Sequence, residues 1–161
     1  MKLHVITTGG TIDKVYFDAK SEFQVGPPMV AEVLREANVT VPVTVESILA
    51  KDSLELTDAD RQLIRERAIA AVEQRILITH GTDTMVDTAR ALAGIPGKTI
   101  VLTGSMQPAR FRNTDAVFNI GCALGAVQSL PPGVYIAMNG RVFDPAHAAK
   151  NRERHCFEET D

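Results

Sequence analysis

Short runs of β-branched and aliphatic residues alternate along the chain with segments of helical periodicity, and this alternation restricts the possible folds more than any other feature. The runs cover residues 2–7, 39–48, 75–79, 98–103 and 133–138. Such an alternation is typical of an α/β domain, in which strand–helix–strand units build a mostly parallel sheet. A length of 161 residues suits one domain of this kind. We therefore predict a single α/β domain with a mostly parallel sheet.

Helices are predicted between these runs from apolar spacing and from capping residues. Pro27-Pro28 suit the first turn of the first helix, and the second helix begins after Thr57, where Asp60 completes an approximate capping box. The third begins near residue 85, and the fourth is capped by Asn113 or Thr114.

Three further segments carry local signals. Residues 13–25 have little period and mix aromatic with charged side chains, so we expect a long loop or a hairpin with a functional role. Pro42 indicates that part of the strand 39–48 lies at a sheet edge. Beyond Met138 the chain is polar, and no further element is expected there.

Charge and hydrophobicity exclude several classes of protein. The chain is 45% hydrophobic and 23% charged, which are ordinary globular values. Lys and Arg number 17 against 20 Asp and Glu, a balance of −3 that argues against a nucleic acid partner. The uncharged stretch 116–140 is interrupted by Asn119, Gln128 and Pro131-Pro132, so it is not expected to span a membrane.

Cysteine content and the first residues indicate the compartment. Cys122 and Cys156 are too few for the disulfide framework of a small secreted domain. Glycine follows the first strand at residues 9 and 10, so the apolar region of a signal peptide is missing. We expect a cytoplasmic protein.

Two loops that follow predicted strands hold the residues best suited to catalysis. They are 7–13 (TTGGTID) and 80–84 (HGTDT). In open α/β sheets ligands bind at the carboxyl ends of strands, where such loops lie. A threonine beside glycines with free backbone N–H groups combines a nucleophile with an oxyanion hole, which suits acyl transfer. Tight turns and helix N-caps use the same residue types, so either loop alone is also compatible with a purely structural role.

A nucleotide-binding interpretation of these glycines fails on residue type. No G-x-G-x-x-G follows the first strand. The sequence Gly97-Lys98-Thr99 has Leu92 where a phosphate-binding loop needs glycine, and it leads into a strand instead of a helix.

Taken together and in this order, the two loops resemble the signatures of the bacterial-type L-asparaginases and glutaminase-asparaginases. The segments that match are 7–12 and 79–85, and three further matches are Asp52-Ser53, 104–108 (GSMQP) and 144–150. The resemblance covers nearly the whole chain. It implies a Rossmann-like, three-layer α/β fold in which residues 1–161 form the N-terminal-type catalytic domain.

The resemblance also implies catalytic roles for three residues. Thr11 would attack the side-chain amide carbonyl of the substrate and form an acyl-enzyme. Lys150, in its neutral form, would take a proton through Thr82, either from Thr11 or from the attacking water. A lysine can act as a base near neutral pH only if burial or a nearby positive charge lowers its pKa from about 10.4. From spacing alone, Lys150 would be a solvated residue of the basic run 150–154.

Substrate recognition follows from the same matches. Asp83 would bind the α-ammonium group, Ser53 the α-carboxylate, and the backbone carbonyl of Ser105 the leaving amide nitrogen. The backbone N–H groups of Thr11 and Thr82 are the expected oxyanion donors. No cofactor is implied.

Other titratable residues receive structural interpretations. His147, His155 and Cys156 fit no familiar zinc spacing, so no metal is predicted. His80 is expected to be a packed, hydrogen-bonded histidine. Asp115 is expected to be an acid of the first turn of a helix.

Two departures from the family pattern leave questions open. Phe23 stands where the family has a tyrosine that assists the nucleophile, and Tyr16 in the same loop either substitutes for it or merely covers the core. Ordinary members also have a second domain, whereas this sequence ends eleven residues after Lys150. It resembles the short, single-domain asparaginases, and we expect a homo-oligomer, at least a dimer, in which a second copy closes the pocket.

The sequence thus predicts an enzyme that hydrolyses L-asparagine to L-aspartate and ammonia. Glutamine or another small amide is the alternative substrate, because one methylene is worth only about 1 to 3 kcal/mol of discrimination. A module that binds aspartate or asparagine without catalysis is the alternative from another class.

Overall fold

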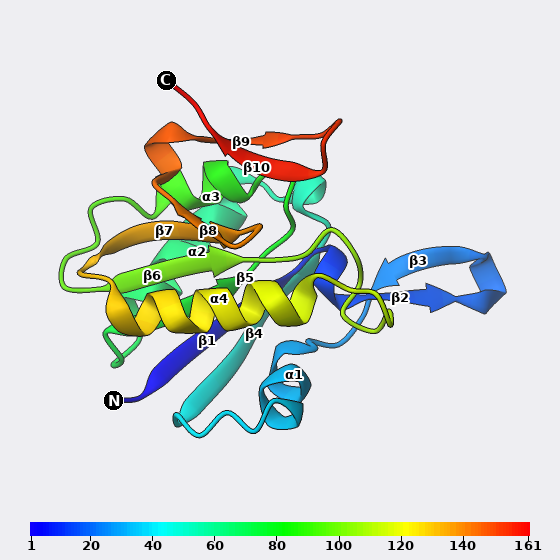
Figure 1. Ribbon diagram of the computed structural model, residues 1–161, viewed down its shortest axis with the longest axis horizontal. Coiled ribbons are helices and arrows are strands. Elements are labelled where there is room, and N and C mark those ends of the chain that lie inside the picture. Colours follow the sequence, from blue (N-terminus) through cyan, green and yellow to red (C-terminus); the bar gives the residue numbers. More distant parts are fainter.

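The central sheet has six strands, five of them parallel (Figure 1). The computed structural model describes all residues 1–161. In spatial order the strands are β4 (Val43–Lys51), β1 (Leu3–Gly9), β5 (Arg75–Thr79), β6 (Thr99–Thr103), β7 (Gly133–Met138) and the antiparallel β8 (Arg141–Phe143). The predicted mostly parallel sheet is confirmed, and β4 lies at its edge as Pro42 indicated.

Helices cover both faces of the sheet, so the domain has three layers (Figure 1). Along β1 and β5, Ile6, Ile76 and Ile78 pack on one side, with α2 (Asp58–Ala70) and α3 (Met85–Ala91). Leu3, Val5 and Leu77 pack on the other, with α1 (Val30–Glu36) and α4 (Ala116–Ser129). Because successive side chains of a strand point to opposite faces, strands buried on both faces are apolar at nearly every position. This explains why β5 was predicted with its observed bounds.

Local signals were correct at the start of one helix and imprecise at the starts of two others. Thr57 and Asp60 form the predicted capping box of α2. Pro27-Pro28 do not form the first turn of α1 as expected, because the helix begins only at Val30. At α4 the residue before the helix is Asp115, and the Thr114 hydroxyl accepts from the Ala116 N–H at 3.0 Å.

The segment 13–25 forms a hairpin, the second of the two expected alternatives. Strands β2 (Lys14–Phe17) and β3 (Glu22–Val25) pair antiparallel around the 3-10 turn η2 (Asp18–Lys20). The hairpin projects from the body of the domain, beyond the carboxyl ends of the parallel strands (Figure 1).

The expectation that no element follows Met138 was wrong. Besides β8, this part holds the 3-10 turn η4 (Pro145–His147) and a hairpin of β9 (Ala148–Asn151) and β10 (Cys156–Glu159). These strands are too short and too polar to show a hydrophobic period. Long-range packing stabilises them, since Phe143 and Phe157 are buried in the core.

No helix combines the length and the apolar character that crossing a membrane requires.

Candidate active site

The loops that carry the predicted site residues meet at the carboxyl ends of the parallel strands. Thr11 opens the 3-10 turn η1 (Thr11–Asp13) directly after β1, and Ser53 opens η3 (Ser53–Glu55) after β4. Thr82 and Asp83 follow β5, Ser105 follows β6, and Lys150 arrives on β9. A parallel sheet places such loops at one edge, which is where its ligands bind.

Glycines allow these loops to touch backbone to backbone. A Cβ on Gly10 would collide with the backbone of Gly81, and a Cβ on Gly81 would lie 2.5 Å from the Ser53 Cβ. In the same way a Cβ on Gly104 would collide with the His80 carbonyl oxygen. The contacts bring the Thr11, Ser53, Thr82 and Ser105 loops together without intervening side chains.

Replacing Gly10 by alanine is therefore expected to destabilise the domain. Gly10 has φ 87° and ψ −176°, a conformation that is essentially restricted to glycine. Strain and collision together should lower the free energy of unfolding by roughly 3 kcal/mol or more. Urea denaturation measures this change. Gly121→Ala is the control, since Gly121 lies in α4 with nothing near its missing Cβ, and it should stabilise by about 0.5–1 kcal/mol. Equal stability of the two variants would contradict the packing argument.

Lys150 joins the two residues of the second loop. Its Nζ donates to the Thr82 hydroxyl at 2.7 Å and to Asp83 Oδ1 at 2.9 Å. The Lys150 side chain is only 15% exposed, so it is not the solvated lysine that spacing alone would suggest.

Asp83 has one oxygen engaged and one available. Oδ1 accepts from Lys150 and lies 3.5 Å from Arg152 Nε. Oδ2 makes no hydrogen bond within the chain and is free to accept from an ammonium group. Sequence reasoning missed Arg152, whose only signal was its place in the basic run 150–154.

Thr11 borders a cavity of about 220 Å³ between the hairpin and the loop after β6. Its hydroxyl makes no hydrogen bond within the chain and is thus available for chemistry. Phe23 and Phe111 line the same cavity, and their ring centroids are 5.6 Å apart. Tyr16 does not line it. The Tyr16 ring is half exposed and packs edge-on against Phe23, with centroids 5.4 Å apart.

The two remaining predicted residues are buried and held by neighbouring loops. The Ser53 carbonyl accepts from the Thr84 hydroxyl at 2.8 Å. The Ser105 hydroxyl donates to the Gln107 carbonyl at 2.5 Å.

Asp115 does more than the helix-end role expected for it. Its carboxylate accepts from the N–H groups of Met106 and Gln107 at 2.9 and 3.0 Å. It also accepts from the Asn119 side chain at 2.9 Å. Asp115 thereby holds the loop that carries Ser105. Its only signal in the sequence was the position before α4.

His80 is packed and hydrogen-bonded, as expected. Its ring nitrogens contact the Gly81 carbonyl at 2.6 Å and the Thr88 hydroxyl at 2.8 Å. Burial lowers the pKa of His80 from 6.5 to about 4. The imidazole is therefore neutral in the folded protein at neutral pH.

The pKa of Asp13 is shifted in the opposite direction to that of His80. Burial raises the pKa of Asp13 from 3.8 to about 6, against the opposing influence of the Met29 N–H and of Arg110. The Met29 N–H donates to the Asp13 carboxyl at 2.9 Å.

The two groups should give opposite slopes of stability against pH. Below pH 6.5 the unfolded chain protonates His80 before the folded one does, so stability is lost as pH falls toward 4. Below about pH 6 the folded chain protonates Asp13 first, so that group adds stability as pH falls toward 3.8. Asp13→Asn removes the second effect, and its stability should fall more steeply than wild type between pH 6 and 4. Urea melts across this range measure both slopes, and parallel profiles would contradict the assignment.

Nowhere do three or more His, Cys, Asp or Glu side chains cluster as ligands for a metal ion.

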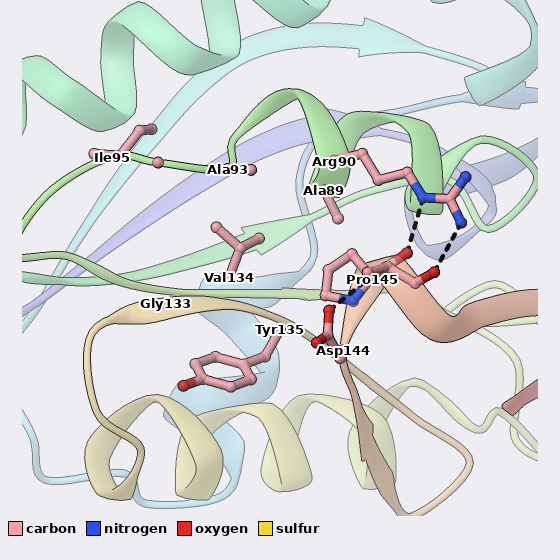
Figure 2. Close-up of a pocket in the computed structure, with 11 residues that line it drawn as sticks. Ala89, Arg90, Ala93, Ile95, Gly133, Val134, Tyr135, Asp144 and Pro145 are labelled. Atoms are coloured by element: carbon pink, nitrogen blue, oxygen red, sulfur yellow. Dashed lines mark hydrogen bonds between the residues drawn. The ribbon is translucent and has the colours of Figure 1, made fainter. Parts of the chain in front are cut away.

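A cavity of about 590 Å³ lies away from these residues, between α3, β7 and η4 (Figure 2). Arg90 of α3 crosses toward η4, where its Nε donates to the Pro145 carbonyl at 2.9 Å (Figure 2). The turn η4 leads directly into β9, so this contact helps to fix the strand that presents Lys150.

These features define an α/β domain whose site, at the carboxyl ends of the parallel strands, combines two threonines with a lysine–carboxylate pair. Residues 2–160 match the family described as "Asparaginase, N-terminal". The chain belongs to the asparaginase family and corresponds to its N-terminal domain.

Three relatives indicate the range of the family. The chain is 34% identical over 152 residues to an L-asparaginase of Thermococcus kodakarensis, covering 88% of this chain and 45% of that protein. The solved structure of the thermostable L-asparaginase from this organism superposes with a TM-score of 0.87 at 29% identity, over 99% of this chain and 51% of that one. A glutaminase-asparaginase of Acinetobacter glutaminasificans is 31% identical over 173 residues, covering 95% of this chain and 51% of that protein.

The third relative carries a different name. It is one component of a glutamyl-tRNA(Gln) amidotransferase of Pyrobaculum aerophilum, 31% identical over 140 residues, covering 81% of this chain and 33% of that protein. The chain thus spans about half of the first two relatives and a third of this one.

Proposed function

We propose that residues 1–161 act as a catalytic domain that hydrolyses L-asparagine to L-aspartate and ammonia. The observation that carries the proposal is the position of Lys150, hydrogen-bonded to both Thr82 and Asp83 and placed on a loop cluster that includes Thr11. A domain that only binds an amino acid has no need for a lysine on a threonine hydroxyl.

In the proposed reaction the Thr11 oxygen attacks the amide carbon. The proton from Thr11 passes through Thr82 to a neutral Lys150, and the amide nitrogen leaves as ammonia after accepting a proton. Water then attacks the acyl-enzyme ester, gives up a proton by the same route, and releases the aspartate side-chain carboxylate and the Thr11 hydroxyl. Tyr16, in the hairpin that projects beyond the site, is the proposed aid to Thr11.

Recognition of the zwitterion relies on two loops. Asp83 Oδ2, which has no partner within the chain, accepts from the α-ammonium group. Ser53 donates to the α-carboxylate, and the Ser105 carbonyl accepts from the amide nitrogen. The backbone N–H groups of Thr11 and Thr82 stabilise the oxyanion, and losing one such donor typically costs about 10² to 10³ in rate.

Glutamine is the second candidate substrate. The glutaminase-asparaginase relative and the glutamyl-tRNA(Gln) amidotransferase relative support it by name.

We further propose that the protein works in the cytoplasm as a homo-oligomer. Both cysteines are unpaired, as in a reducing compartment. Tyr16, Phe17, Phe23 and Phe111 are exposed apolar side chains of the hairpin and of the loop after β6, and a second copy would cover them. Light scattering at working concentration tests this, and an active monomer would contradict it.

Ammonia release from L-asparagine and from L-glutamine by the purified chain tests the proposed activity. Turnover of asparagine with the higher kcat/KM is the expected result, and preference for glutamine would assign the second candidate. Calorimetric binding of L-aspartate without any ammonia release would instead identify an amino-acid-binding module.

A further inference from the structure

Lys14 lies at the base of the hairpin, three residues after Thr11. Its Nζ is 2.9 Å from Asp52 Oδ2, and the two side chains are 25% and 33% exposed. It is the only ion pair between the hairpin β2–β3 and the rest of the chain. Lys14 also lines the cavity that Thr11 borders.

Asp52 uses its second oxygen to shape the turn that holds Ser53. Oδ1 accepts from the Leu54 N–H at 3.1 Å, so the carboxylate caps η3. Burial raises the pKa of Asp52, but the combined lowering by Lys14 and the Leu54 N–H is larger. The pKa of Asp52 therefore lies below its usual value. The carboxylate is therefore charged and bridges Lys14 to the Ser53 turn.

Lys14 and Ser53 thus belong to one connected unit. The Lys14 end is continuous with η1, which begins at Thr11. The Ser53 end packs against Gly81 and accepts from Thr84. A second contact joins the same two segments, because the Gly10 N–H donates to the Lys51 carbonyl at 2.9 Å. The chain therefore runs side by side where it enters η1 and η3.

We propose that Lys14 is a positioning residue for the reaction: through Asp52 it fixes the Ser53 turn relative to Thr11 and couples it to the base of the hairpin. This inference rests on the proposed function of the site. The substrate carboxylate on Ser53 is bound equally before and during attack. Loss of Lys14 should therefore weaken substrate binding more than it slows the chemical step.

The test compares Lys14→Met, Lys14→Arg and Asp52→Asn with Lys20→Met. Lys20 lies on the same hairpin, is exposed and forms no ion pair, so it is the matched control. Asp52→Asn keeps an acceptor for the Leu54 N–H and removes the negative partner of the Lys14–Asp52 ion pair. The measurements are KM and kcat for ammonia release, the Kd of L-aspartate by calorimetry, and hydrogen exchange of the Leu54 and Leu56 amides.

In Lys14→Met we expect KM and the aspartate Kd to rise about tenfold, as on losing one charge-assisted hydrogen bond, with kcat within about threefold. The Leu54 and Leu56 amides should exchange faster, Lys14→Arg should recover most of the affinity, and Lys20→Met should match wild type. Combining Lys14→Met with Asp52→Asn should add nothing to either change alone.

The proposal is overturned if KM and Kd stay within about twofold of wild type, if kcat alone falls, or if the two substitutions are additive. Should Lys14→Met fail to fold, Asp52→Asn, which removes the same ion pair, decides by the criteria for KM, Kd and kcat. If wild type neither binds aspartate nor releases ammonia, the proposed function fails. Hydrogen exchange of the Leu54 and Leu56 amides then tests whether Lys14 holds the Ser53 turn. Exchange that is unchanged in the variants would overturn that part of the proposal.

Discussion

Thr11→Ala is expected to reduce ammonia release by at least about 10³-fold and to leave the Tm within a few degrees of wild type. The substitution removes the proposed nucleophile. It leaves no buried partner unsatisfied, because the Thr11 hydroxyl makes no hydrogen bond within the chain. Initial rates with the preferred amide and thermal melts by circular dichroism measure the two effects separately.

Thr11→Ser is the control for this experiment, because it keeps a hydroxyl in place and should keep measurable turnover. If Thr11→Ala retained more than about a tenth of the wild-type kcat, the nucleophile would have to be assigned elsewhere, with Thr82 as the first candidate. A fall in activity accompanied by a large fall in Tm would mean instead that Thr11 has a structural role.

Lys150→Met is expected to produce a loss of similar size, about 10³-fold in kcat. The methionine keeps the length and most of the volume of the side chain but removes the group that contacts the Thr82 hydroxyl and Asp83. Proton transfer through Thr82 would then have no acceptor. Steady-state kinetics with the preferred amide, together with aspartate binding, separate this effect from a loss of affinity.

Arg152→Met is the matched control for Lys150. Arg152 also lies near Asp83, at 3.5 Å, but its side chain is 68% exposed, and such a pair contributes little. We expect kcat within about threefold of wild type for Arg152→Met. Equal losses in the two variants would indicate that general positive charge around Asp83, and not proton transfer by Lys150, supports activity.

The sequence predicted the parallel core because its strands are buried on both faces. Strand β5 (Arg75–Thr79) has an apolar run that leaves no other interpretation, and it was placed with its observed bounds. Strand β4 was predicted four residues too early at its start, since Val39 and Val41 pack against the core from the connection after α1.

The C-terminal strands escaped prediction because their stability is not local. Strand β10 depends on contacts such as the Phe157 N–H donating to the Asn139 side chain, and on the burial of the Phe157 ring. Neither contact can be read from a four-residue polar segment.

The sequence identified residues of the candidate site but not the contacts between them. The family resemblance identified Thr82 and Lys150, but their hydrogen bond joins positions 68 residues apart and depends on the undetected β9. Lys14 and Asp115 have ordinary sequence surroundings, and Asp52 was noted only as part of the match with Ser53, so only the folded loops reveal what the three residues hold. Tyr16 keeps its predicted role as a hypothesis, with Phe23 the aromatic residue that lines the cavity beside Thr11.

The position of Lys150 on β9 has a consequence for protein synthesis. Thr11, Ser53, Thr82 and Ser105 all precede α4, and every parallel strand is complete by Met138. Lys150 is placed only when β9 pairs with β10, whose last residue is Glu159. A chain emerging from the ribosome can therefore assemble the sheet and the threonine loops while the group that contacts Thr82 is still absent. If Lys150 is the base, as proposed, the growing polypeptide would stay inactive until the β9–β10 hairpin has formed.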